Sequence, residues 1–449
     1  MYQQRDSASL IMKASAATIC AAIAMYWPAY VVAPSIIGAL LRPILLVSAA
    51  IMSMCLLQEP VTAIEVRTLK LFGAMWLLVL LTSAMADNPR HALIGFVKIV
   101  LIQLLALLMA RALRYEPAAR VFGTGMFVAS IIITLFIVYA YLTKVGPVLP
   151  SYVGARIFKG MAEHDGYSLN DTPATAILAF LCAICLRPMT RTMWAVGAMV
   201  VFVGAFLTGS RAALVTPALA AILLLAVAWR HSNRLARRMI AVTIFLSIFA
   251  GVTVAIAVVP SHQFSKLSEG RWDLWRAGIS KFLERPLFGS GFLSWQDDLT
   301  ARLPGDYGIN AGLHRDNSGQ LLGGYHNQFI QVLSEHGLAG FIALSALYIF
   351  ILRSAAALAF RKTLVWKFGY AALFGALFLL VRANVELDGL FGFAQDPVDY
   401  TAYLFLAIVV SRLSLEEMAA RPLSVRWRSA ARPPRRIPAV PRQSPLREA

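Results

Sequence analysis

Residues 92–142 read ALIGFVKIVLIQLLALLMARALRYEPAARVFGTGMFVASIIITLFIVYAYL, and this stretch decides the fold. It contains two long apolar runs, 92–113 and 119–142, joined by a short connection with Arg111, Arg114 and Arg120. An unpaired backbone amide in lipid costs several kcal/mol, so apolar runs of about 20 residues cross a membrane as helices. The stretch therefore predicts a helical hairpin made of two membrane spans.

The same pattern recurs along nearly the whole chain of 449 residues, of which 59% are hydrophobic and 14% charged. The predicted run 35–57 contains Arg42 and Pro43, so residues 28–58 could hold a further short helix. We therefore predict an all-α polytopic membrane protein with about twelve spans. The predicted runs are 10–28, 35–57, 68–86, 92–113, 119–142, 171–187, 191–207, 211–229, 238–259, 328–353, 364–382 and 398–413.

The basic residues indicate the orientation of these spans. Lys and Arg are enriched in cytoplasmic connections of membrane proteins. An N-terminus in the cytoplasm puts every basic cluster there, together with the C-terminal tail. The net charge of +18 then records topology and argues against nucleic-acid binding, although the tail could also contact anionic lipid heads. We expect a membrane domain at 1–413 and a basic cytoplasmic tail at 414–449. The clusters lie at 111–120, 187–191, 230–238 and 361–367.

Two long connections, 143–170 and 260–327, then lie on the opposite side of the membrane. The second has seven Lys/Arg and seven Asp/Glu, and long mixed loops of this kind usually carry function. Part of it has helical spacing, with Ser268 as its N-cap and Pro286 and Gly289 at its end. We expect this amphipathic helix to lie in the membrane interface. Its apolar face comprises Trp272, Trp275, Ile279, Phe282 and Leu283.

Three polar elements on that outer side could carry chemistry. Arg211, in Thr208-Gly209-Ser210-Arg211, and Arg271, which opens the amphipathic helix, are candidate ligands of a phosphate. Read alone, the first could equally reach lipid heads and the second could be a solvated charge. His326, in His326-Asn327-Gln328, precedes an apolar run and could accept a proton near neutral pH, or merely cap the helix.

Further candidates have weaker support. Arg156 and Lys159 could add positive charge beside a diphosphate, while Arg382, Glu386 and Asp388 are expected to form a local ion network. The pair Asp297-Asp298 reads as a solvated turn, because a metal–diphosphate site needs converging carboxylates. We therefore expect neither a metal nor another cofactor.

In order along the chain, these motifs resemble the O-antigen ligase and polymerase superfamily of bacterial membrane glycosyltransferases. They are T-G-S-R at 208–211, G-R-W-x-x-W with R-P-L-x-G-x-G at 270–291, and H-N-Q with E-x-G-x-x-G at 326–340. The resemblance implies a GT-C-like enzyme of the bacterial inner membrane with a periplasmic site. Its essential groups map onto Arg211, Arg271 and His326. Trp272, Asn327, Arg382, Arg156 and Lys159 are kept as possible binders of diphosphate or glycan.

A ligase of that superfamily transfers O-antigen from undecaprenyl diphosphate to lipid A-core, inverting the sugar without a metal. A polymerase or a protein O-glycosyltransferase of the same superfamily remains an alternative. A lipid-glycan transporter would be expected to bury ionisable groups at the membrane midplane, whereas the polar residues here cluster at one face. A purely structural membrane protein would leave the long mixed loop unexplained.

Overall fold

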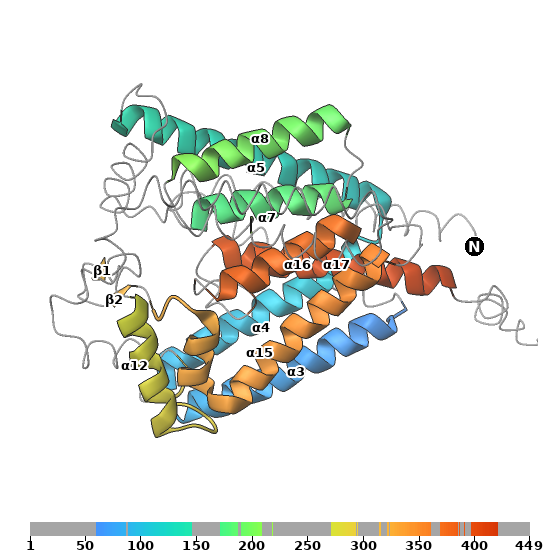
Figure 1. Cartoon of the computed structure of the whole chain (residues 1–449). Helices are drawn as coiled ribbons and strands as arrows, with labels where there is room; N and C mark the ends of the chain where they lie inside the picture. Colours follow the sequence, from blue (N-terminus) through green and yellow to red (C-terminus); the bar gives the residue numbers. More distant parts are fainter. Residues whose placement is uncertain are drawn as a thin grey trace, which may run out of the picture.

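The computed structural model is helical (Figure 1). It describes residues 60–86, 89–145, 171–186, 190–208, 218, 271–292, 294, 314–315, 321–322, 324–360, 369–384, 386, 390 and 397–420. The helices are α3 (Ala63–Ala84), α4 (Pro89–Ala112), α5 (Glu116–Val145), α7 (Asp171–Leu186), α8 (Arg191–Leu207), α12 (Arg271–Glu284), α15 (Gln328–Phe360), α16 (Gly369–Ala383) and α17 (Pro397–Ala420). Two short antiparallel strands, β1 (His314–Arg315) and β2 (Leu321–Leu322), accompany them.

Each predicted apolar run between 68 and 207, and each between 328 and 413, coincides with a helix. Among the described residues, three helices are long and apolar enough to cross a membrane: Ala92–Ala112, Glu116–Thr143 and Gln328–Phe360. Shorter apolar helices cover Thr172–Leu186, Ala195–Leu207 and Gly369–Ala383. The runs 10–28, 35–57, 211–229 and 238–259 lie essentially outside the described residues, so the count of twelve spans stays a prediction.

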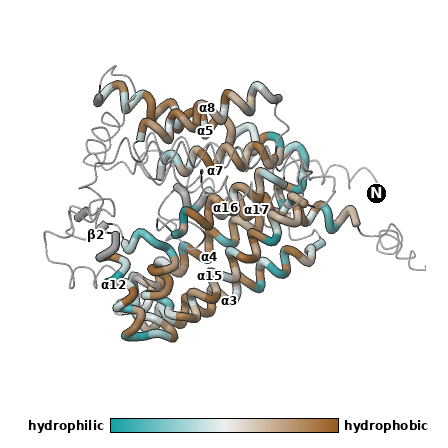
Figure 2. The backbone as a smooth tube through the Cα atoms, in the orientation of Figure 1, coloured by the Kyte–Doolittle hydropathy of each residue, from teal (hydrophilic) through white to brown (hydrophobic). Residues whose placement is uncertain are grey.

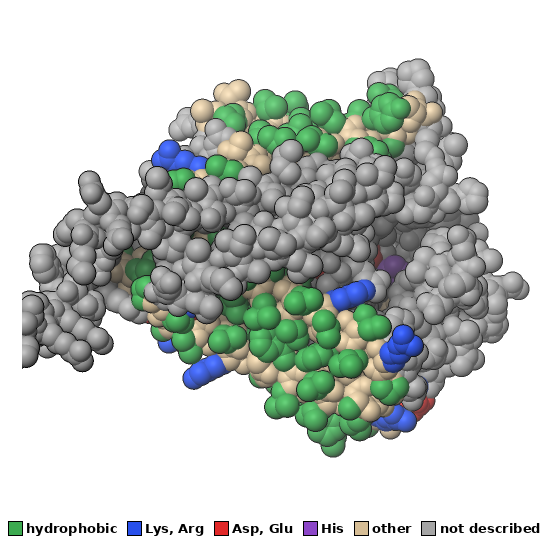
Figure 3. Space-filling model, turned by 180° about the vertical axis from the view of Figure 1, so that it is seen from behind, with side chains coloured by type: hydrophobic (Ala, Val, Ile, Leu, Met, Phe, Trp, Pro, Cys, Tyr) green, Lys and Arg blue, Asp and Glu red, His purple; other side chains and the backbone are tan. Residues whose placement is uncertain are grey.

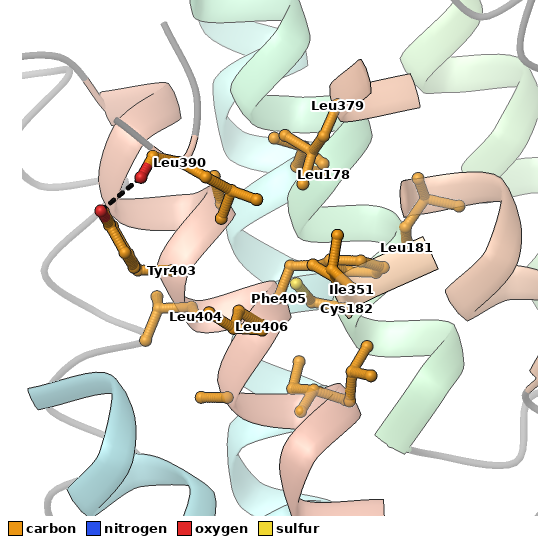
Figure 4. Close-up of a cluster of buried hydrophobic side chains, with 14 of the residues drawn as sticks. Leu178, Leu181, Cys182, Ile351, Leu379, Leu390, Tyr403, Leu404, Phe405 and Leu406 are labelled. Carbon is orange, nitrogen blue, oxygen red and sulfur yellow. Dashed lines mark hydrogen bonds between the residues drawn. The ribbon is translucent and has the colours of Figure 1, made fainter. Parts of the chain in front are cut away.

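Helix α17 forms the centre of the bundle. Every residue from Thr401 to Arg412 is buried, as expected for a helix that is apolar all round. Figure 4 shows Phe405 and Leu406 of α17 among Cys182 of α7 and Ile351 of α15. Around this core the outer helices are hydrophobic along most of their length (Figure 2). In Figure 3, exposed hydrophobic side chains of the described helices form two regions, with basic side chains at their margins.

One end of the bundle is closed by a polar cluster. Glu65 of α3 accepts hydrogen bonds from the Thr62 amide (2.9 Å) and from Nε of Arg111 (3.2 Å), and it also pairs with Arg114. Glu417 of α17 accepts from the Ala63 amide at 2.9 Å. The beginning of α3 and the ends of α4 and α17 therefore meet, as the predicted alternation of spans requires.

The opposite end contains a break in α15. Gly337 has φ 64° and ψ −159°, which interrupts the helix between a short segment, 328–336, and a long one, 338–360. The short segment folds back on the long one, because Tyr348 donates a hydrogen bond to the Gln328 side chain at 2.8 Å. The expected single run 328–353 is therefore wrong in this detail. The long segment is still about 34 Å in length, enough to cross a bilayer.

A backbone pairing fills the break. The amides of Ser290 and Gly291 donate to the carbonyls of Ser334 and Glu335 at 3.0 and 2.9 Å. In return, the Leu338 amide donates to the Pro286 carbonyl at 2.8 Å, and the Ala339 amide to the Leu287 carbonyl. A helix end leaves such amides and carbonyls without partners inside the helix. Here the backbones of two distant glycine-containing motifs supply the missing hydrogen-bond partners to each other. Gly337 thus has a conformational role.

Gly337→Ala should lower the stability of the protein. Its positive φ is strained for alanine by about 1–3 kcal/mol, and a Cβ there would overlap the Leu287 backbone. Thermal unfolding of the purified protein in detergent measures the change. Gly73→Ala in α3 is the matched control, since a Cβ there meets nothing within 4 Å and alanine favours helix. Equal melting temperatures for the two variants would contradict the assigned role of Gly337.

Candidate functional site

His326 is held in a constrained position at the start of α15. Its φ is 48°, and it is the only described non-glycine residue with positive φ. Its Nδ1 lies 3.0 Å from Oε2 of Glu386, and the two side chains are 18% and 4% exposed. A carboxylate only accepts hydrogen bonds, so in the neutral ring the proton sits on Nδ1 and Nε2 remains an acceptor. The contact therefore fixes the orientation of the ring and leaves Nε2 as an acceptor.

Asn327 joins this base to the end of α16. Its Oδ1 accepts from the Ile330 amide at 3.0 Å, which is an N-cap, and its Nδ2 donates to the Asn384 carbonyl at 2.9 Å. The amide of Gln328 donates to the Glu386 carbonyl at 3.1 Å. Backbone and side chain together thus fix residues 326–328 to residues 384–386. Both polar groups of Asn327 are used within the protein.

Behind His326, a cluster of buried polar side chains extends toward α3. Nε2 of Gln331 donates to Oε1 of Glu335 at 2.5 Å. Nδ1 of His336 lies 2.7 Å from the Thr82 hydroxyl, and its ring stacks on Phe292 with centroids 5.5 Å apart. Glu335 and His336 are fully buried, so their contacts position the short segment of α15. Of the two histidines of this motif, only His326 is accessible.

Helix α12 packs across the segment that contains His326. Gly278 lies against Tyr325 and Ile330, so any Cβ at that position would overlap Ile330. The predicted amphipathic helix is confirmed, and it ends at Glu284, just before Pro286. Part of its apolar face points away from the protein: Ile279 is 46% and Leu283 68% exposed. That exposure agrees with the expected place of the helix in the membrane interface.

The remaining predicted site residues have different outcomes. Arg271 and Trp272 form the first turn of α12, and only their place in that helix is described. Arg382, in the last turn of α16, is completely buried, and its carbonyl accepts the Glu386 amide at 2.8 Å. The Glu386 carboxylate contacts His326, and the expected ion network of Arg382, Glu386 and Asp388 stays a prediction. Arg211, Arg156, Lys159, Asp388 and the pair Asp297-Asp298 lie outside the described residues.

Sequence reasoning missed Glu386 as the partner of His326, which lies 60 residues away. The available signal was a carboxylate directly after a span, on the side of the membrane where the histidine was expected. As for metals, the described part of the chain contains no group of three or more His, Cys, Asp or Glu residues able to hold one. Independence from metals stays a prediction.

A comparison with known families identifies this part of the chain. Residues 195–345 match the family described as O-antigen ligase. The match covers about a third of the chain, and it shows that this segment is similar to that family. The matched segment begins in α8 and extends through α12 into α15, so it includes all three motifs quoted from the sequence and confirms the resemblance. No curated protein matches the chain.

Two substitutions distinguish the contributions of the two hydrogen bonds that the Asn327 side chain forms. Asn327→Ala removes both, and loss of an N-cap costs about 0.5–2 kcal/mol. Asn327→Ser keeps a capping oxygen for Ile330 but cannot reach the Asn384 carbonyl. We expect Ala to lower the melting temperature more than Ser, while both loosen the contact of residues 326–328 with α16. Identical melting temperatures for wild type and Asn327→Ala would disprove the cap.

Proposed function

We propose that this protein is an O-antigen ligase. It transfers O-antigen polysaccharide from undecaprenyl diphosphate to a sugar hydroxyl of lipid A-core, at the periplasmic face of the bacterial inner membrane. The observation that supports the proposal is the 3.0 Å contact between His326, which lies in the segment that matches the O-antigen ligase family, and Glu386, which follows α16.

The proposed orientation has both termini in the cytoplasm. The polar cluster of Glu65, Arg111 and Arg114 occupies one end of the bundle, and the His326 segment occupies the other. Arginine-rich connections favour the cytoplasmic side, so His326 would face the periplasm. The full topology of about twelve spans and the GT-C-like architecture belong to the same proposal.

The mechanism follows from the chemistry of the leaving group. The acceptor hydroxyl attacks the anomeric carbon of the donor sugar from the face opposite the diphosphate. As the new C–O bond forms, the bond from that carbon to the phosphate oxygen breaks, which inverts the centre. Nε2 of His326 takes the hydroxyl proton, and Glu386 stabilises the imidazolium that results. Undecaprenyl diphosphate leaves with the bonding electron pair.

Arg211 and Arg271 would bind the diphosphate and stabilise the charge that grows on its bridging oxygen. Arg156, Lys159 and Arg382 would add positive potential, and Trp272 would help to define the glycan site. Asn327 would act by holding the His326 segment in place, because both of its polar groups are used within the protein. The position of α12 supports the role of Arg271, because this helix packs directly on Tyr325, next to the base. No metal is required, since the diphosphate is already a stable leaving group.

Purified protein with undecaprenyl-diphosphate glycan and rough lipopolysaccharide, in buffer containing a metal chelator, tests this function. We expect glycan attached to lipid A-core. His326→Ala and His326→Asn should abolish this product, and Asn is the better matched variant because it tolerates positive φ. Longer lipid-linked glycan in place of the ligated product would identify a polymerase, and product formed by His326→Asn would refute the assigned base.

Glu386→Gln should reduce kcat while leaving the KM for the donor unchanged. Glutamine can still accept from Nδ1 of His326, but it does not stabilise an imidazolium charge. The loss of kcat should be at least about tenfold. It should stay below the effect of removing the base itself, which contributes about 10²–10⁴-fold. Steady-state kinetics of the ligation measure it. Glu417→Gln, at the opposite end of the bundle, is the control: it should affect stability only, and equal kcat losses in both variants would exclude a positioning role for Glu386.

A further inference from the structure

Helix α4 has two basic residues on its outward face. Arg90 and Lys98 are both exposed and lie two turns apart, with Ile94 between them. The neighbouring side chains, Val97 and Leu101, are also exposed and apolar. Lys98 is six residues inside the span that begins at Ala92, so its Cα lies about 9 Å along the helix from that point.

A lysine on the lipid-facing side of a span is unfavourable unless an anion or the headgroup region receives its charge. Helix α4 contains no Asp or Glu, and none of the ion pairs between described residues involves Arg90 or Lys98. Both side chains are long enough to carry their charges along the helix toward the membrane surface. An anion at the headgroup level is therefore the fitting partner for both.

This cationic stripe, Arg90 and Lys98, borders the segment that positions the base. Gly95, one helical turn from Lys98, lies directly against the Phe292 ring, and Phe292 stacks on His336 of α15. The stripe therefore begins at the end of the bundle that holds His326. Figure 3 shows basic side chains at the margin of the apolar face.

We propose that Arg90 and Lys98 bind the phosphate groups of the glycolipid acceptor. The inference rests on the proposed ligase function, in which two lipids must be held at once. Arg211 and Arg271 are assigned to the diphosphate of the donor, so a second pair of cations on a lipid-facing helix fits the phosphorylated sugar of the second lipid. Its acyl chains would lie along Ile94, Val97 and Leu101, which are already exposed to lipid.

The kinetic test compares a phosphorylated acceptor with the same acceptor after phosphatase treatment. Lys98→Gln should raise the KM for the phosphorylated acceptor about tenfold, the effect of losing one charge-assisted contact, and leave the KM for the donor unchanged. With the dephosphorylated acceptor, wild type and Lys98→Gln should have the same KM. An equal rise with both acceptors would overturn the proposal.

Lys70→Gln is the matched control, because Lys70 is an exposed lysine between Val66 and Leu77 on α3, nearer the polar cluster of Glu65. A binding experiment separates this inference from the proposed activity. Protein in nanodiscs that contain either a bis-phosphorylated lipid A or phosphatidylglycerol is released into a native mass spectrometer. We expect wild type and Lys70→Gln to retain lipid A and Lys98→Gln to lose it. Equal retention of phosphatidylglycerol, or equal loss in Lys70→Gln, would refute the site, whatever the ligation assay shows.

Discussion

The exchange of backbone hydrogen bonds between residues 286–291 and residues 334–339 is the constraint on which the site depends. A helix that stops near a membrane surface exposes carbonyls at one end and amides at the next beginning, and lipid offers them no partner. Here the carbonyls of Ser334 and Glu335 and the amides of Leu338 and Ala339 find partners in the turn after α12. The break in α15 and the position of α12 therefore require each other.

Glycines make this close pairing possible. A Cβ at Gly289 would overlap the backbone of Glu335, and a Cβ at Gly291 would overlap Ala86 after α3. Both glycines also have positive φ, which other residues rarely adopt. The turn thus joins α3, α12 and α15 at the same end of the bundle. A motif that contains no catalytic group is explained in this way by backbone geometry alone.

The sequence predicted the apolar helices and the amphipathic helix, because their signals are local: run length, helical spacing and the proline after Glu284. It did not predict the break at Gly337, since a glycine inside an apolar run also fits an unbroken helix. Nor did it predict the contact of His326 with Glu386, because the two helices that separate them in sequence, α15 and α16, must first pack against each other. The roles of Arg211 and Arg271 stay predictions, since they depend on side chains that the structure does not describe.

His326 combines a positive φ with a surrounding set of contacts that holds its segment in place. A histidine with positive φ stores strain, which persists only where the surroundings over-determine the conformation. Those surroundings are the Asn327 contact with Asn384, the Gln328 bond to the Glu386 backbone and the carboxylate on Nδ1. The helix cap needs none of these, because it is the separate bond from the Ile330 amide to Oδ1 of Asn327. A base that must meet an acceptor hydroxyl from one direction needs all three, because proton transfer depends on distance and alignment. The proposed proton transfer at Nε2 would account for the strain at His326, which the start of the helix alone does not.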